Sequence, residues 1–153
     1  MRMTLKRANA VIKAAKLNGF GGNCGRAAIA INHVLFHGQG KYVVATNPPL
    51  NRRLGRWFMG HVVVEWGGRL FDSTGLVEDE VGLEAWGMLD YADPAVQQLV
   101  SEGEAEEGEP HTIDELGDQR QQEKLIEAAM TGLQARQPLV LMRRQLEAAL
   151  ART

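Results

Sequence analysis

The chain has 153 residues, of which 44% are hydrophobic and 24% are charged. This length and composition are typical of one globular domain with a buried core, and they exclude a disordered chain. No apolar run approaches the ~18 residues that a spanning helix needs, so we expect no membrane-spanning segment. The single cysteine excludes an intrachain disulfide, which fits a reducing compartment.

Charge is divided unevenly along the chain. Residues 1–72 contain eleven Lys or Arg and two acidic residues, a net of +9, whereas residues 73–153 contain six and seventeen, a net of −11. Either the acidic half folds onto the basic half, or the two halves attract different partners. We do not expect a nucleic acid partner, because the sequence has no zinc-finger, helix-turn-helix or aromatic RNA-binding motif.

Residues 4–17 are predicted to form an amphipathic helix that covers the core. Its apolar residues recur at helical spacing: Leu5, Ala8, Val11, Ile12 and Ala15. Basic residues interrupt the apolar run that a signal peptide requires. We therefore expect a cytoplasmic protein, or an exported effector without a conventional signal peptide.

A second helix is predicted from Cys24 to about His37, where Gly38 and Gly40 end it. Residues 41–45, KYVVA, read as a strand. Residues 46–57 read as a loop, because two adjacent prolines prevent regular structure there.

A β-hairpin is predicted over residues 61–74, with Gly67 and Gly68 as its two-residue turn. This turn makes Val64 oppose Phe71, Val63 oppose Asp72 and His61 oppose Thr74. Side chains alternate between the faces of a sheet. One face therefore carries His61, Val63, Asp72 and Thr74, and the core face carries Val62, Val64, Trp66 and Phe71.

The second half of the chain is predicted to be mainly helical. Residues 83–100 read as one or two short helices, and residues 101–111 as an acidic linker or loop. Helices follow at about 112–135 and 139–151, with apolar residues suited to the core or to a homodimer seam. We therefore expect one domain over residues 1–100, the linker over 101–111 and a helical extension over 112–153.

The position of Cys24 raises a chemical question, since it follows Gly21, Gly22 and Asn23 at the start of a helix. Unsatisfied backbone N–H groups and the helix dipole favour a thiolate there. Glycines also let a substrate backbone approach closely. A structural cysteine is the alternative.

A catalytic cysteine needs a base, and His61 is the candidate. His33 and His37 lie about 14 and 20 Å along the helix from Cys24, at ~1.5 Å per residue, and cannot reach it. Their spacing could hold a metal, but no third ligand accompanies them. Asp72 lies diagonal to His61 at a Cβ separation of roughly 6–8 Å, within reach of an imidazole–carboxylate contact.

A cysteine at a helix start, a histidine on a strand and an aspartate on the next strand resemble the papain-like superfamily of thiol hydrolases. The similarity is to its compact branches: bacterial papain-fold deamidase toxins, transglutaminase-like proteins and arylamine N-acetyltransferases. It depends on the motifs GGNC and GHVVVEWGGRLFDSTG within residues 18–75.

The resemblance implies an α+β fold in which the nucleophile helix packs on a small antiparallel sheet, with additional C-terminal helices. It also implies that Cys24 is the nucleophile, His61 the general base and acid, and Asp72 the orienting carboxylate. Asn18 or Asn23 would help to hold the oxyanion, and Gly22 would admit the substrate. The resemblance makes residues 1–100 the catalytic domain. We expect no metal and no cofactor, because the sequence shows no third metal ligand and no coenzyme A site.

The sequence therefore predicts a hydrolase that cleaves protein or peptide amides through a thioester. Glutamine deamidation and proteolysis remain open, as does acyl transfer to an amine. The alternative is a module that keeps this scaffold to bind a partner protein and catalyses nothing.

Overall fold

The computed structural model describes residues 2–17, 24–46, 52, 55, 59–77, 94, 98, 101–103, 109–112, 117–129 and 138–153. Within these ranges the fold is α+β. Four longer helices are present, α1 (Leu5–Ala15), α2 (Cys24–Leu35), α6 (Gln119–Ala129) and α7 (Leu139–Arg152). The described strands are β1 (Lys41–Thr46), β2 (Met59–Trp66), β3 (Arg69–Asp72), β4 (Gly75–Leu76) and β5 (Glu109–Thr112).

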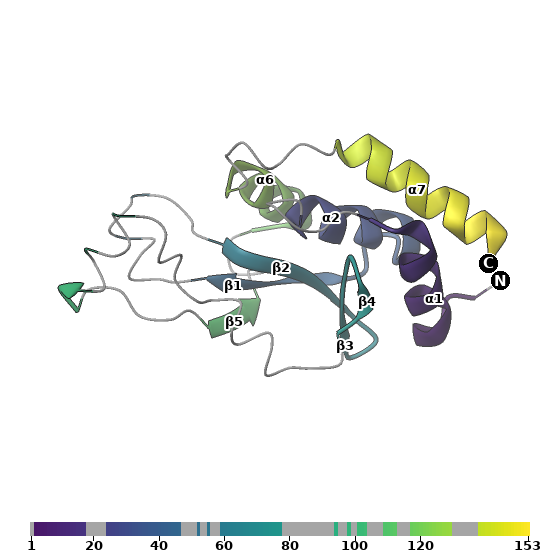
Figure 1. Ribbon diagram of the computed structural model, residues 1–153, viewed down its shortest axis with the longest axis horizontal. Helices are drawn as coiled ribbons and strands as arrows, with labels where there is room; N and C mark the ends of the chain where they lie inside the picture. Colours follow the sequence, from purple (N-terminus) through teal and green to yellow (C-terminus); the bar gives the residue numbers. More distant parts are fainter. Residues whose placement is uncertain are drawn as a thin grey trace.

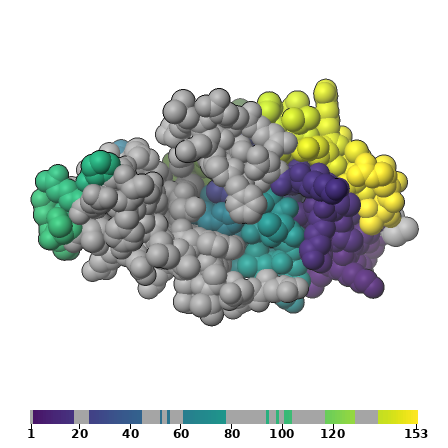
Figure 2. Space-filling view, viewed as in Figure 1, coloured from purple at the N-terminus to yellow at the C-terminus, as the bar shows by residue number. Residues whose placement is uncertain are grey.

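The strands form an antiparallel sheet with the order β4-β3-β2-β1-β5. Helix α2 packs on β2 and β3, and α6 and α7 pack against α2, so these three helices lie above the sheet, whereas α1 lies beside β4 (Figure 1). Helices α1 and α7 lie side by side, although they come from opposite ends of the sequence (Figure 2). This arrangement encloses one main core between helices and sheet.

The first helix forms as predicted. The Thr4 hydroxyl accepts a hydrogen bond from the Arg7 backbone N–H at 3.1 Å, which caps the N-terminus. The apolar stripe faces the core, where Ala8, Val11 and Ile12 have no exposed surface. The amphipathic pattern therefore predicted the buried face of this helix correctly.

The second helix begins at Cys24 as predicted but ends at Leu35, two residues early. Its end is held by Asn32, whose side chain is fully buried. The Asn32 Oδ1 accepts the Gly40 N–H at 2.8 Å, and its Nδ2 donates to the Gly40 carbonyl at 3.3 Å. Gly40 is required there, since a Cβ would lie 2.4 Å from Val64 Cγ2.

We expect Asn32→Leu to lower the free energy of unfolding by about 2–4 kcal/mol, because it leaves the buried N–H and carbonyl of Gly40 without partners. Asn9→Leu is the matched control, since Asn9 is only partly buried and accepts one bond, from the Leu76 N–H. Urea unfolding of both variants measures the difference. Equal destabilisation would contradict this role for Asn32.

The predicted hairpin is confirmed in its turn and its register. Gly67 and Gly68 have φ of 59° and 74°, the left-handed values that a two-residue hairpin turn needs. The β2–β3 pairs are Val64–Phe71, Glu65–Leu70 and Trp66–Arg69. The predicted core face is also confirmed, since Val62, Val64 and Phe71 are buried in the main core and Trp66 packs against it.

Two predicted pairs of the hairpin are wrong. Val63 was expected to oppose Asp72, and His61 to oppose Thr74, but the β2–β3 pairs end at Val64 and Phe71. The cause is a second tight turn: β3 ends at Asp72, and Asp72 pairs with Gly75 at the start of β4. Thr74 therefore belongs to a turn and not to a strand opposite His61.

The C-terminal region differs from the prediction at its start. Residues 109–112 form β5, which pairs with β1, although 109–111 were expected in the linker or loop and Thr112 in a helix. The helix expected from about 112 begins at Gln119. Helix α7 matches its predicted range, and its Met142 and Leu146 are buried in the same core as the N-terminal helices.

Two predictions lie mostly outside the described residues, namely the loop that follows β1 and the short helices over 83–100. Over the part of the chain that the structure describes, no helix has both the length and the apolarity needed to cross a bilayer.

Candidate active site

Cys24 is the first residue of α2 and is partly buried against the main core. The N–H groups of a first helical turn have no partners within the helix, and the dipole makes this end positive. An anionic sulfur is stabilised in such a place. Asn18, Gly22 and Asn23, the predicted oxyanion and substrate residues, lie outside the described residues.

His61 lies on β2 and contacts both of its predicted partners. Its Nε2 is 3.4 Å from Asp72 Oδ2, and its side chain also hydrogen-bonds to Cys24. The side chains of His61 and Asp72 are 18% and 12% exposed, so water screens their interaction only weakly. The structure therefore brings together three residues from a helix and two strands.

The charges at this site favour an imidazolium. Burial alone lowers the pKa of His61, but hydrogen bonds and electrostatic interactions of its ring with Asp72 and Cys24 raise it to about 9. Burial has the opposite effect on a carboxyl group and raises the pKa of Asp72. The hydrogen bonds from His61 and Thr74 outweigh burial and hold this pKa below its usual value. At neutral pH His61 is thus a cation between two acidic groups.

The Asp72 carboxylate is held by the turn that follows it. Its Oδ1 accepts hydrogen bonds from the Thr74 N–H at 2.8 Å and from the Thr74 hydroxyl at 2.5 Å. This Asx turn leaves Oδ2 directed at His61. Thr74 was predicted only as a neighbour on the same face, although an aspartate two residues before a threonine, within DSTG, is a sequence signal for such a turn.

The turn between β3 and β4 is also attached to α1. Gly75 has φ of 108°, and a Cβ there would lie 2.3 Å from Asn9 Oδ1. The same Asn9 oxygen accepts the Leu76 N–H at 2.8 Å. The first helix thereby fixes β4 and, through it, the position of the carboxylate.

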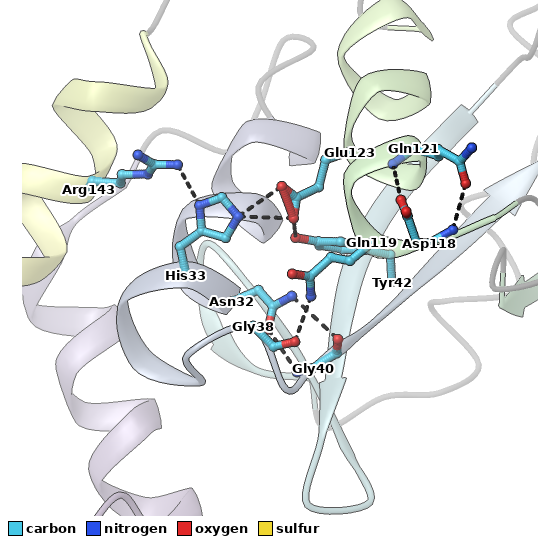
Figure 3. Close-up of polar contacts among 10 residues, drawn as sticks. All are labelled: Asn32, His33, Gly38, Gly40, Tyr42, Asp118, Gln119, Gln121, Glu123 and Arg143. Atoms are coloured by element: carbon cyan, nitrogen blue, oxygen red, sulfur yellow. Dashed lines mark hydrogen bonds and ion pairs between the residues drawn. The ribbon is translucent and has the colours of Figure 1, made fainter.

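A second polar cluster joins α2 and β1 to the C-terminal helices (Figure 3). Arg143 Nη2 lies 2.5 Å from His33 Nδ1, and His33 Nε2 lies 2.9 Å from both Glu123 oxygens. Because a guanidinium only donates, Nδ1 accepts and the His33 proton is on Nε2, directed at the carboxylate. The Tyr42 hydroxyl donates to Glu123 Oε2 at 2.7 Å.

This cluster was not predicted, and its role is structural. Tyr42 is 1% exposed, and burial, with the nearby Glu123 carboxylate, raises its pKa far above the usual value. It therefore stays a neutral donor. The cluster explains His33 without a metal, and His37 lies beyond the helix with φ of 51°. Among the described side chains, no group of three or more His, Cys, Asp or Glu is placed to hold a metal ion.

Comparisons with protein-family models, with curated proteins and with solved structures found no match for this chain. The functional assignment therefore depends on the geometry of the site itself.

Proposed function

We propose that the protein is a thiol hydrolase that acts on protein amides through Cys24, His61 and Asp72. The observation that supports this most is the continuous hydrogen-bonded series from Cys24 through His61 to Asp72. Nucleophile, base and orienting group stand in this order in thiol hydrolases. A purely structural cysteine would not need a histidine cation beside it.

The first step follows from the charges. With a pKa of about 9, His61 is protonated at neutral pH and stabilises the Cys24 thiolate beside it. The thiolate attacks the amide carbonyl carbon, and the carbonyl oxygen becomes an oxyanion. Backbone N–H groups at the start of α2 are suited to hold that charge, with Asn18 or Asn23 as additional donors.

The following steps need His61 as acid and then as base. His61 gives its proton to the leaving nitrogen, the C–N bond breaks, and a thioester with Cys24 remains. His61 then takes a proton from water, whose hydroxide attacks the thioester and releases the carboxylic acid. Since Nε2 faces Asp72, the other ring nitrogen, Nδ1, is the one that exchanges protons with Cys24 and the substrate.

Asp72 keeps this ring in one orientation and stabilises its positive charge. The Nε2···Oδ2 distance of 3.4 Å is long for a hydrogen bond. Catalytic hydrogen bonds are often long without substrate and shorten in the reacting complex. We expect the same shortening here, while Thr74 holds the other carboxylate oxygen.

The papain-like classification is part of this proposal. Its support is the order of the elements, with a nucleophile helix followed in the chain by the two strands that carry the histidine and the aspartate. A glutamine side chain as substrate would give deamidation, and a main-chain amide would give proteolysis. Both use the same thioester.

Alkylation of Cys24 tests the proposal directly. At pH 6 a free cysteine with a pKa of ~8.5 is almost entirely protonated and reacts slowly. We expect iodoacetamide to alkylate Cys24 at least ~10-fold faster than it alkylates the thiol of glutathione. His61→Ala should remove most of this difference in rate. A Cys24 that reacts no faster than glutathione would favour the non-catalytic binding module.

Incubation of a cell lysate with the protein then identifies the reaction. Mass spectrometry should find glutamines converted to glutamates, or new chain termini, that are absent with Cys24→Ala. The first result assigns a deamidase and the second a peptidase.

A further inference from the structure

A pocket of about 580 Å³ lies at the opposite end of α2 from Cys24. Val34, Leu35 and Phe36 form part of its wall, and Val34 follows Cys24 by ten residues, ~15 Å along a helix. Pockets that hold small molecules have volumes of roughly 300–1,000 Å³. The pocket is thus large enough for a ligand and separate from the proposed triad.

Four parts of the chain meet around this pocket. Arg2, Met3 and Arg7 come from the N-terminal segment and α1, Trp66 from the tip of the β2–β3 hairpin, and Leu150 from α7. Close packing of α1 and α7 brings the two ends of the sequence to the same place. A site built from such distant segments exists only in the folded chain.

One part of the pocket is apolar and aromatic. The rings of Phe36 and Trp66 stack with centroids 4.6 Å apart and planes 8° from parallel. Phe36 is buried, whereas Trp66 is only partly buried, so the indole is the ring that a ligand can reach. Flat aromatic ligands pack well against such a surface.

The polar part of the pocket is cationic. Its polar lining consists of Arg2, Arg7, His37 and Gln39. None of the described residues that line the pocket is acidic, although the whole chain has a net charge of −2. The planar guanidinium of arginine binds a carboxylate through two parallel hydrogen bonds.

We infer that this pocket binds a small aromatic carboxylate. The carboxylate contacts Arg2 and Arg7, and the ring lies against Trp66 within the apolar wall. The inference stands independently of the proposed hydrolase function, because the pocket shares no residue with the triad.

Calorimetric titration with naphthoate, together with amide NMR spectra, tests this inference. We expect saturable binding with shifts confined to the residues around the pocket. Naphthalenemethanol, the neutral analogue, should bind at least ~10-fold more weakly, because it cannot form charge-assisted hydrogen bonds with the arginines. Decanoate, which keeps the carboxylate but has no ring, should also bind more weakly than naphthoate.

The variant Arg2→Gln/Arg7→Gln should weaken naphthoate binding at least ~10-fold. Lys13→Gln is the matched control, since it removes one positive charge from the same helix outside the pocket, and it should bind as the original protein does. If the double variant does not fold, Arg2→Gln with Arg7→Lys still removes one charge and one guanidinium fork.

Three results would overturn the inference: equal binding of naphthoate and its neutral analogue, binding unchanged in the arginine variant, or shifts scattered over the surface. Tighter binding of decanoate than of naphthoate would overturn the aromatic assignment. None of these measurements depends on Cys24, so their failure would leave the hydrolase proposal unaffected.

Discussion

Cys24→Ala and His61→Ala should each lower turnover by at least ~10³-fold, with the fold intact, because nucleophile and base act as one unit. Without Cys24 no thioester forms. Without His61 the thiolate loses its counter-cation and the leaving nitrogen loses its proton donor. The two side chains are in contact, so removal of either one disables the same step.

The double variant separates this mechanism from two independent contributions. If the residues act together, Cys24→Ala/His61→Ala should be no slower than the slower single variant. Turnover is measured on the substrate identified in lysate, and melting temperatures report whether the variants fold. Near-original turnover in either single variant would show that the mechanism is wrong.

Local sequence signals predicted the hairpin because its geometry is determined locally. Gly67 and Gly68 supply the left-handed backbone of the turn, and the turn fixes which residues of β2 and β3 pair. The same local rule failed at His61 and Thr74. A second tight turn after Asp72 ended the ladder, and its signal, an aspartate two residues before a threonine, was not used.

Pairings between distant residues were less accessible from the sequence. Glu109–Thr112 forms β5 next to β1, although its residues, EPHT, lack alternating apolar positions. Its strand conformation comes from hydrogen bonds to β1 and not from local preference. The contact of His33 with Glu123 joins residues 90 positions apart and has no local signal either.

The candidate site contains one contact that follows from a local sequence signal and one contact between distant segments. Strand register placed Asp72 near His61, and the structure agrees, with Nε2 and Oδ2 3.4 Å apart. No local rule brings the start of α2 to β2. The contact of Cys24 with His61 was expected because a catalytic cysteine needs a base, and the resemblance to papain-like enzymes implied the same pair. Packing of α2 on the sheet, through the apolar residues of both, is what produces that contact.

Asp72→Asn is expected to lower turnover by about 10²–10⁴-fold, the usual range for disturbed general acid–base catalysis. In the protein, Thr74 donates two hydrogen bonds to Oδ1 and His61 faces Oδ2. An amide would keep its oxygen at Thr74 and turn its NH₂ group toward His61 Nε2. Two donors would then face each other unless His61 loses its Nε2 proton and becomes neutral.

The effect of Asp72→Asn on the pH dependence of activity follows from the loss of the Nε2 proton from His61. His61 has a pKa of about 9 because Asp72 and Cys24 outweigh the effect of burial, so activity that needs the imidazolium should decline as the pH rises through about 9. Without the Asp72 charge the pKa of His61 falls, and the decline should begin at a lower pH. Titration of the His61 ring by NMR measures the shift directly.

Glu65→Gln is the control. Glu65 follows His61 by four residues on β2, so its side chain is on the same face but nearer the hairpin turn. It removes the same charge from the same face, and it should leave both turnover and the His61 titration almost unchanged. A purely structural Asp72 would give another pattern: Asp72→Asn would lower the melting temperature through its contacts with Thr74, while the His61 titration stayed the same. Measured together, these two quantities distinguish an orienting carboxylate from one that only closes the turn between β3 and β4.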